Sequence, residues 1–220
     1  SLMADMNIAY AMIIGAERLS KFVNWSDRST CILFGDGAGC AILENSDLAD
    51  PGVKSSLAYK LEIEGDYLAG KYDSNRYLTL DSRFSLDEDK YPYIGMNGRQ
   101  IYKFATDVGV KVVDKLLGDR GLSRDDIELI VPHQANKRII ETLAIKSQIP
   151  EDKWFVNLDK YGNTSAASVP LALNEVVEDV LSGRDLDQMD GKRILSIAFG
   201  GGLSYGGFLL RIRKKEDLDK

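Results

Sequence analysis

The stretch IELIVPHQAN at residues 127–136 is the most informative part of this sequence. It opens with a mostly apolar run of the length of a buried strand, and Pro132 and His133 follow the end of that run. Apolar residues at three- and four-residue spacing predict a helix before it, over residues 98–117, and another after it, over residues 135–147. Helix, strand and helix in this order predict an α/β layered fold with a mostly parallel sheet.

The alternation continues toward the C-terminus. A short strand is expected over residues 154–158, and a helix over residues 165–181. Two apolar runs, 193–199 and 203–211, flank the glycines at 200–202. This pattern predicts two strands joined by a tight turn.

The N-terminal part contains mainly short apolar runs. Residues 8–15, 30–34 and 56–63 are each expected to form a strand. The motif GDGAG at residues 35–39 is expected to be a tight turn that leads into a further strand at 40–43, because clustered glycines mark turns. The motif matches neither a phosphate-binding loop nor a dinucleotide fingerprint, so we interpret it as structural.

A polar segment separates these two parts and shows no clear period. We therefore expect an N-terminal part of one layered unit, a polar connection, a second layered unit and a charged tail. Their expected bounds are 1–65, 66–93, 94–213 and 214–220.

Composition excludes several classes of protein. The chain has 220 residues and a net charge of −6, which disfavours a nucleic-acid partner. It has no apolar run long enough to predict a membrane span. The two cysteines form no disulfide framework, so a reducing, cytoplasmic setting is expected. The one histidine lies in no His/Cys cluster with metal-ligand spacing, so no metal is expected.

Three motifs stand where ligand groups gather in α/β folds, at the ends of expected strands. They are VPHQAN at 131–136, GNTSAAS at 162–168 and FGGG at 199–202. Each also has a purely structural interpretation. His133 would then be a hydrogen-bonded residue near a helix start, Thr164 or Ser165 a helix cap, and the three glycines a tight turn.

Taken together and in order, GDGAG, VPHQAN, GNTSAAS and FGGG resemble the β-ketoacyl-acyl carrier protein synthase III family of condensing enzymes. The resemblance runs over residues 8–211. It implies a thiolase-like fold, with layers in the order α-β-α-β-α in the intact family. The chain would supply the C-terminal half and the last strands of the N-terminal half.

The family joins an acyl-CoA primer to malonyl-acyl carrier protein by decarboxylative Claisen condensation, which starts fatty acid synthesis. The resemblance implies that His133 and Asn163 stabilise the enolate formed on decarboxylation, as two neutral donors. It also implies that the backbone N–H of Gly201 helps to bind the acyl-enzyme oxyanion.

The resemblance further implies binding positions for both substrates. Those expected to contact coenzyme A or its pantetheine arm are Arg28, Gly98 and Asn136. Those expected to dock acyl carrier protein are Lys103 and Arg138, and the nearby basic residues Arg99 and Lys137 are expected to take part. The alternative for Lys103 is a simple surface ion pair with Asp107.

The family cysteine would lie upstream of Ser1, at a helix N-terminus that favours a thiolate. Cys31 and Cys40 are expected in buried strands and cannot replace it, so we expect the chain alone to have no condensing activity. The resemblance implies a homodimer and no cofactor beyond the substrates. Two alternatives remain: a related condensing acyltransferase of secondary metabolism, and a non-catalytic partner subunit of the same fold.

Overall fold

The computed structural model describes residues 2–48, 59–80, 92–181 and 184–214. The strands are β1 (Tyr10–Arg18), β2 (Asp36–Glu44), β3 (Tyr59–Gly70), β4 (Leu78–Leu80), β5 (Ile94–Met96), β6 (Ile127–Pro132), β7 (Arg193–Gly200) and β8 (Ser204–Lys214). The α-helices are α1 (Leu2–Asp5), α2 (Gly98–Gly118), α3 (Lys137–Ser147), α4 (Leu158–Tyr161), α5 (Ser168–Glu175) and α6 (Leu186–Met189).

Shorter helical segments complete the described chain. Four are 3₁₀ turns: η1 (Leu19–Phe22), η2 (Arg124–Asp126), η3 (Glu151–Lys153) and η4 (Ser165–Ala167). The fifth, η5 (Val176–Leu181), is a π-helical continuation of α5. The helix expected over 165–181 is therefore present. It begins with a 3₁₀ turn and ends with a π-helical segment.

The central sheet has the strand order β3-β8-β7-β6. β6 and β7 are parallel, whereas β7–β8 and β3–β8 are antiparallel. The prediction of a mostly parallel sheet is therefore wrong. A three-residue turn joins β7 directly to β8, and so short a connection can join only antiparallel strands.

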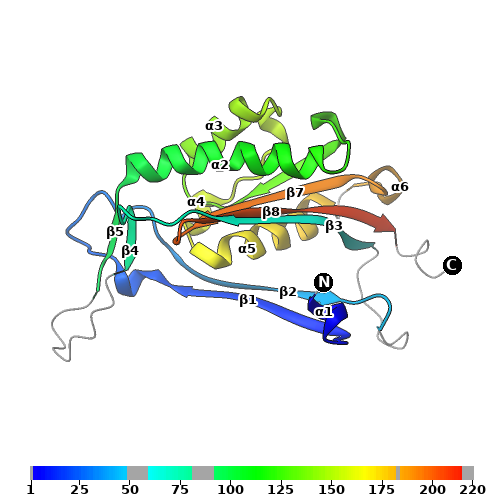
Figure 1. The fold of residues 1–220 in the computed structure, drawn as a ribbon, viewed down its shortest axis with the longest axis horizontal. Coiled ribbons are helices and arrows are strands. Elements are labelled where there is room, and N and C mark those ends of the chain that lie inside the picture. Colours follow the sequence, from blue (N-terminus) through cyan, green and yellow to red (C-terminus); the bar gives the residue numbers. More distant parts are fainter. Residues whose placement is uncertain (1, 49–58, 81–91, 182–183, 215–220) are drawn as a thin grey trace.

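Alternating side chains of the sheet strands build two apolar cores. Ile130 and Leu195 face α2 and α3, where they join Leu116 and Leu143. Leu129 and Val131, together with Ile194, face α5 on the opposite side. This alternation is the consequence of the two-residue period of a strand. The sheet is thus covered by helices on both faces (Figure 1).

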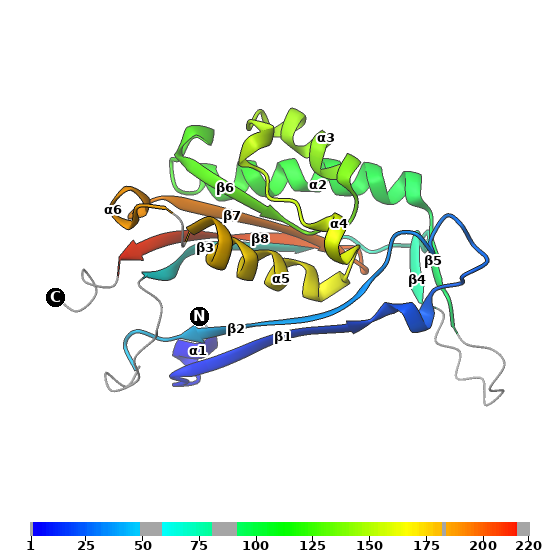
Figure 2. The same ribbon diagram turned by 180° about the vertical axis from the view of Figure 1, so that it is seen from behind.

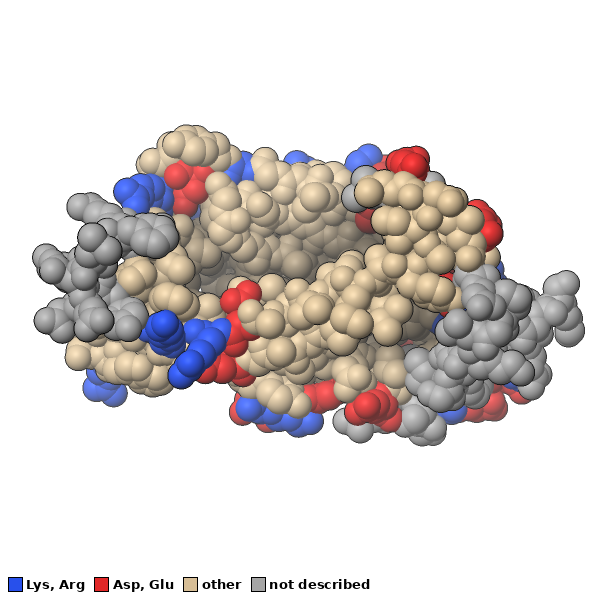
Figure 3. Space-filling model, turned by 90° about the horizontal axis from the view of Figure 1, so that it is seen from below, with Lys and Arg blue, Asp and Glu red and all other residues tan. Residues whose placement is uncertain are grey.

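A second layer of strands lies beyond α5. β1 and β2 form an antiparallel pair below α5, so the layers run α2/α3, central sheet, α5 and β1/β2 (Figures 1 and 2). The α/β layered fold predicted from the sequence is confirmed. The outer face of the β1–β2 pair carries Met12, Ile14 and Ile42, which are 59%, 63% and 66% exposed. The view from below shows few charged side chains over the middle of the molecule (Figure 3).

The GDGAG motif forms no turn. Residues 36–39 lie within β2, and the glycines permit close packing rather than a change of direction. A Cβ on Gly35 would lie 1.9 Å from the carbonyl oxygen of Tyr161, and one on Gly39 would lie 2.8 Å from Pro170 Cβ. The motif therefore sets β2 directly against α4 and α5, and its partner strand is β1, not a neighbour across a hairpin.

The strand predicted over residues 30–34 is also wrong. Asp27 organises this segment into turns, because its carbonyl accepts from the amides of Thr30 and Cys31 and its carboxylate accepts from Ser29. Cys31 thus lies in a turn, while Cys40 lies in β2 as expected. Cys40 is exposed rather than buried, since it projects from the outer face of the β1–β2 pair.

Two further expectations change. β3 extends to Gly70 through continuous pairing with β8, and β4 pairs with β5, so the polar segment is partly strand. Residues 81–91 of this segment lie outside the described chain. The strand expected over 154–158 is reduced to one bridge between Trp154 and Ile130, after which α4 begins. No helix in the described chain has the length and apolar character needed to cross a membrane.

Candidate active site

His133 is the first residue after β6 and is held by backbone and ring contacts. Its amide donates to the carbonyl of Ile197 on β7 at 2.7 Å. Its imidazole packs edge-on against Phe199, with ring centroids 5.3 Å apart. The residue is only 9% exposed, and burial lowers the pKa of His133 to about 4. The ring is therefore neutral at physiological pH.

Ser168, the first residue of α5, contacts the same ring. Its Oγ lies 2.5 Å from His133 Nδ1. The same oxygen accepts a hydrogen bond from the amide of Gln134 at 3.4 Å. No other described group hydrogen-bonds the ring, so Nε2 is left for a substrate.

Asn163 stands on the loop before α5, where its backbone is fixed by the segment that precedes β2. Its amide donates to the carbonyl of Leu33 at 2.8 Å, and its carbonyl accepts from Gly35 at 3.0 Å. The side-chain oxygen accepts from the amide of Ser165 at 2.9 Å. With that oxygen occupied, the side-chain NH₂ group keeps its two N–H donors, for which no partner occurs among the described residues.

Gln134 ties the His133 loop to the chain that leads to Asn163. Its amide nitrogen donates to the carbonyls of Pro132 and Phe155 at 2.9 and 3.2 Å, and its oxygen accepts from Asn157 at 3.1 Å. Gln134 is 1% exposed, so each of these bonds is shielded from water.

Glu175 adds further hydrogen bonds to the Gln134 network, next to α4. Its carboxylate accepts from Asn157 at 3.3 Å and from Lys160 at 2.8 Å. Burial raises the pKa of Glu175, but hydrogen bonds from Lys160, Tyr161 and Asn157 outweigh burial and hold the pKa below its usual value. A charged carboxylate therefore anchors the loop that carries the site.

The other sequence-predicted residues lie at the same end of the molecule by the placement of their elements. Gly201 is in the turn after β7, which runs parallel to β6 and ends beside it. Gly98 is the first residue of α2, and Asn136 caps α3, where its side chain accepts from the amide of Arg138 at 2.9 Å. Arg28 is exposed in the turns before β2. These helix starts and strand ends face the same side of Figure 1.

The basic residues expected to dock a partner are exposed within the first two turns of α2 and α3. Asp107 pairs with Lys146 at 2.9 Å, so the simple Lys103–Asp107 pair does not form. Within the described chain, Arg99, Lys103 and Arg138 make no ion pair, and Lys137 lies 3.9 Å from Glu141.

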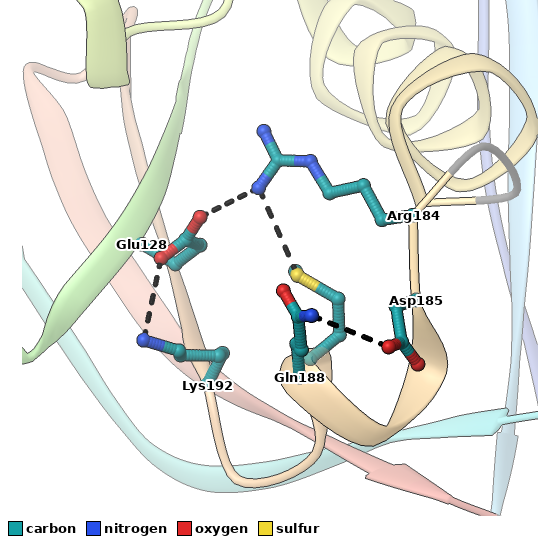
Figure 4. A pocket seen from close by; sticks show the side chains of 6 residues that line it. Glu128, Arg184, Asp185, Gln188 and Lys192 are labelled. Atoms are coloured by element: carbon teal, nitrogen blue, oxygen red, sulfur yellow. Dashed lines mark hydrogen bonds and ion pairs between the residues drawn. The ribbon is translucent and has the colours of Figure 1, made fainter.

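A separate polar depression lies at the opposite end of the sheet (Figure 4). Arg184 donates to Glu128 at 2.5 Å, and Lys192 lies 3.8 Å from the other oxygen of that carboxylate. Both cations thus pair with the same carboxylate. The described residues also include no cluster of side chains suited to a metal ion.

The geometry around His133 can therefore present two neutral N–H donors, one from an imidazole and one from an amide. Such a pair suits an oxygen that gains negative charge during a reaction. A neutral ring keeps its donor without adding a fixed positive charge.

Comparison with known proteins identifies the family. The model described as "3-Oxoacyl-[acyl-carrier-protein (ACP)] synthase III" matches residues 1–63, and that described as "3-Oxoacyl-[acyl-carrier-protein (ACP)] synthase III C terminal" matches residues 117–212. The chain belongs to the β-ketoacyl-[acyl-carrier-protein] synthase III family. The synthase III of Clostridium beijerinckii is 44% identical over 211 residues, and that of Syntrophomonas wolfei is 39% identical over 214 residues.

Solved synthase III structures share the fold. The crystal structure of the Aquifex aeolicus enzyme superposes with a TM-score of 0.77 at 37% identity, over 96% of this chain and 60% of that one. The thiolase-like fold expected from the resemblance is thus confirmed. The alignments cover 96% of this chain and 61% of the C. beijerinckii protein, and 94% and 59% for S. wolfei. The chain therefore spans about three fifths of the length of these synthase III relatives.

Sequence reasoning missed the supporting roles of Gln134, Ser168 and Glu175. Gln134 and Ser168 lie within quoted motifs, but their contacts link residues 21 to 35 positions apart. Local spacing carries no signal for such contacts. A polar residue inside an otherwise buried stretch was the one available sign, since such residues usually serve a hydrogen bond.

Proposed function

We propose that this chain is part of an acyltransferase that condenses an acyl-CoA primer, such as acetyl-CoA, with malonyl-acyl carrier protein. The observation that carries the proposal is the buried, neutral His133 with a free Nε2, beside the loop that presents the Asn163 amide. Decarboxylation of a malonyl thioester releases CO₂ and leaves an enolate. Two neutral donors lower the barrier by stabilising that oxygen.

In this proposal His133 Nε2 and the Asn163 amide bind the malonyl thioester oxygen, and the Gly201 amide binds the oxyanion of the acylated cysteine. Arg28, Gly98 and Asn136 contact coenzyme A or pantetheine. The nucleophile is expected from the part of the relatives that precedes the aligned segment. The chain alone is therefore proposed to be inactive in condensation.

Acyl carrier protein is the proposed macromolecular partner. It is acidic, and the exposed cations at the starts of α2 and α3 would steer it toward the site. The cations concerned are Arg99, Lys103, Lys137 and Arg138. That three of them have no ion pair within the described chain supports this role, because unpaired charges are available to a partner.

Further properties follow from family membership and are proposals of the same kind. The protein would act as a cytoplasmic homodimer and use no cofactor beyond its thioester substrates. The boundary between the two layered units is proposed near residue 65. β3 (Tyr59–Gly70) crosses this position and pairs with β8 on both sides of it, so the strand as a whole would belong to the second unit.

A chimera tests the proposal. It joins the part of the C. beijerinckii protein that precedes its aligned segment to residues 1–220 of this chain. Acetyl-CoA and malonyl-acyl carrier protein are supplied, and acetoacetyl product and CO₂ are measured. His133→Ala and Asn163→Ala are each expected to lower kcat by about 10² or more, the usual effect of losing an oxyanion donor.

Lys115→Ala serves as the control, because Lys115 lies near the far end of α2 and pairs with Asp119 at 2.6 Å. It should leave the rate unchanged, and the chain without the added part should make no product. A folded chimera that takes up the acetyl group yet makes no acetoacetyl product would overturn the proposal. Such a result would favour a partner subunit without catalytic activity.

A further inference from the structure

The hydroxyl of Ser168 has two partners, and their chemistry bears on the proton of the His133 ring. Ser168 Oγ contacts His133 Nδ1 at 2.5 Å and accepts from the Gln134 amide at 3.4 Å. Ser168 is 2% exposed, so solvent offers no alternative. Within the described chain, no other hydrogen bond of this hydroxyl occurs.

A hydroxyl donates one proton and accepts through its oxygen lone pairs. The Gln134 amide can only donate. If Nδ1 also donated, the Ser168 proton would be buried with no acceptor, which is unfavourable. If Nδ1 is unprotonated, all three groups are satisfied at once.

We propose that Ser168 donates its hydroxyl proton to His133 Nδ1 and thereby holds the neutral ring as the Nε2–H tautomer. Ser168 is then a positioning residue for the site. The inference rests on the proposed function only in its consequence: Nε2–H is the form that can donate to an enolate oxygen. The opposite tautomer would place a lone pair against that oxygen.

The chain offers a direct measurement, because His133 is its one histidine. In the ¹⁵N-labelled chain without substrate, the imidazole nitrogens give one pair of NMR signals. Couplings to the two ring carbon-bound protons distinguish Nε2 from Nδ1. At pH 7 we expect a single species protonated on Nε2, and a ring protonated on Nδ1 would overturn the proposal.

Variants of Ser168 then test whether its hydroxyl causes the preference for the Nε2–H tautomer. Ser168→Ala is expected to give a detectable fraction of the Nδ1–H tautomer, and Ser168→Thr, which keeps the hydroxyl, is expected to restore one species. Ser196→Ala is the matched control, because the Ser196 hydroxyl is also buried, on neighbouring β7, but has no partner in the described chain. A Ser168→Ala spectrum identical to that of Ser196→Ala would refute the role of Ser168.

In the active chimera, Ser168→Ala should lower kcat about tenfold with little change in KM, the effect of one lost hydrogen bond. The NMR result does not depend on turnover. A failed condensation assay with an Nε2–H ring would therefore reject the proposed function and keep the tautomer assignment. If Ser168→Ala does not fold, the spectrum of the unaltered chain decides the assignment alone.

Discussion

His133 couples the site to stability, because its ring is neutral in the folded chain and titrates freely when unfolded. Its pKa falls from 6.5 to about 4 on burial. As pH drops below 6.5, the unfolded chain binds a proton that the folded chain does not. The contribution of His133 to the free energy of unfolding is therefore fully present above pH 6.5, and it is lost progressively as the pH falls toward 4.

This pH dependence predicts a measurable difference between the unaltered chain and the His133→Gln variant. Urea unfolding at pH 7 and pH 5 should show a loss of about 2 kcal/mol that is present in the unaltered chain and absent from His133→Gln. The variant controls for the carboxylates, which titrate in both chains. Equal pH dependence in the two chains would mean that His133 is not buried as described.

At the scale of elements, α2 and α3 pack closely where Gly109 meets Leu143. A Cβ on Gly109 would lie 2.5 Å from Leu143 Cδ2, inside the fully buried core. Gly109→Val should therefore overpack the contact and lower the free energy of unfolding by about 1–3 kcal/mol. Thermal or urea unfolding measures the change.

Gly118, at the end of the same helix, provides the matched control. A Cβ there meets nothing within 4 Å, so Gly118→Val should change stability by less than about 0.5 kcal/mol. If both variants lose the same stability, the loss does not come from the contact between Gly109 and Leu143, because valine has a higher helix propensity than glycine at either position. The Gly109 contact also fixes the mutual position of the two helix starts that carry the basic residues.

Those helix starts are predicted to determine the use of acyl carrier protein. In the chimera, Lys103→Glu should raise KM for malonyl-acyl carrier protein several-fold, because the site on α2 would then repel an acidic partner. KM for acetyl-CoA should remain unchanged. Lys115→Glu, on the same helix but paired with Asp119, should alter neither constant. The effect should weaken with added salt.

For the whole molecule, the outer face of the β1–β2 pair is an exposed apolar surface that the described layers leave uncovered. Met12 lies opposite Ile42 across the pair, and Ile14 lies two residues along the same strand as Met12, so the three exposed side chains share one face. Large exposed apolar patches favour association. The chain alone is therefore expected to self-associate as its concentration rises.

The double variant Ile14→Thr/Ile42→Thr tests this expectation, because threonine keeps strand propensity while it removes apolar area. Light scattering after size-exclusion chromatography should show a smaller mass than for the unaltered chain. Ile145→Thr is the control, since Ile145 is 79% exposed on α3 and lies outside this face. An unchanged mass in the double variant would contradict association through β1 and β2.

The sequence by itself was sufficient for the family, the layered α/β class and the positions of most helices and strands. The helices over 98–117 and 135–147 and the strand at 127–131 show their period or apolar run locally, and the structure places α2, α3 and β6 there. His133 and Asn163 were predicted as site residues because short motifs keep their residue types in order. Local patterns failed where a residue serves a distant contact.

Tertiary structure decided the rest. The GDGAG glycines were taken for a turn, yet they admit α4 and α5 against β2, and no local period reports such an approach. Asp27 turned an apolar run into consecutive turns through its own hydrogen bonds. Above all, the contact between Ser168 and His133 joins residues 35 positions apart. Only the packing of α5 beneath the central sheet creates it, so only the folded chain reveals the proton that the site presents.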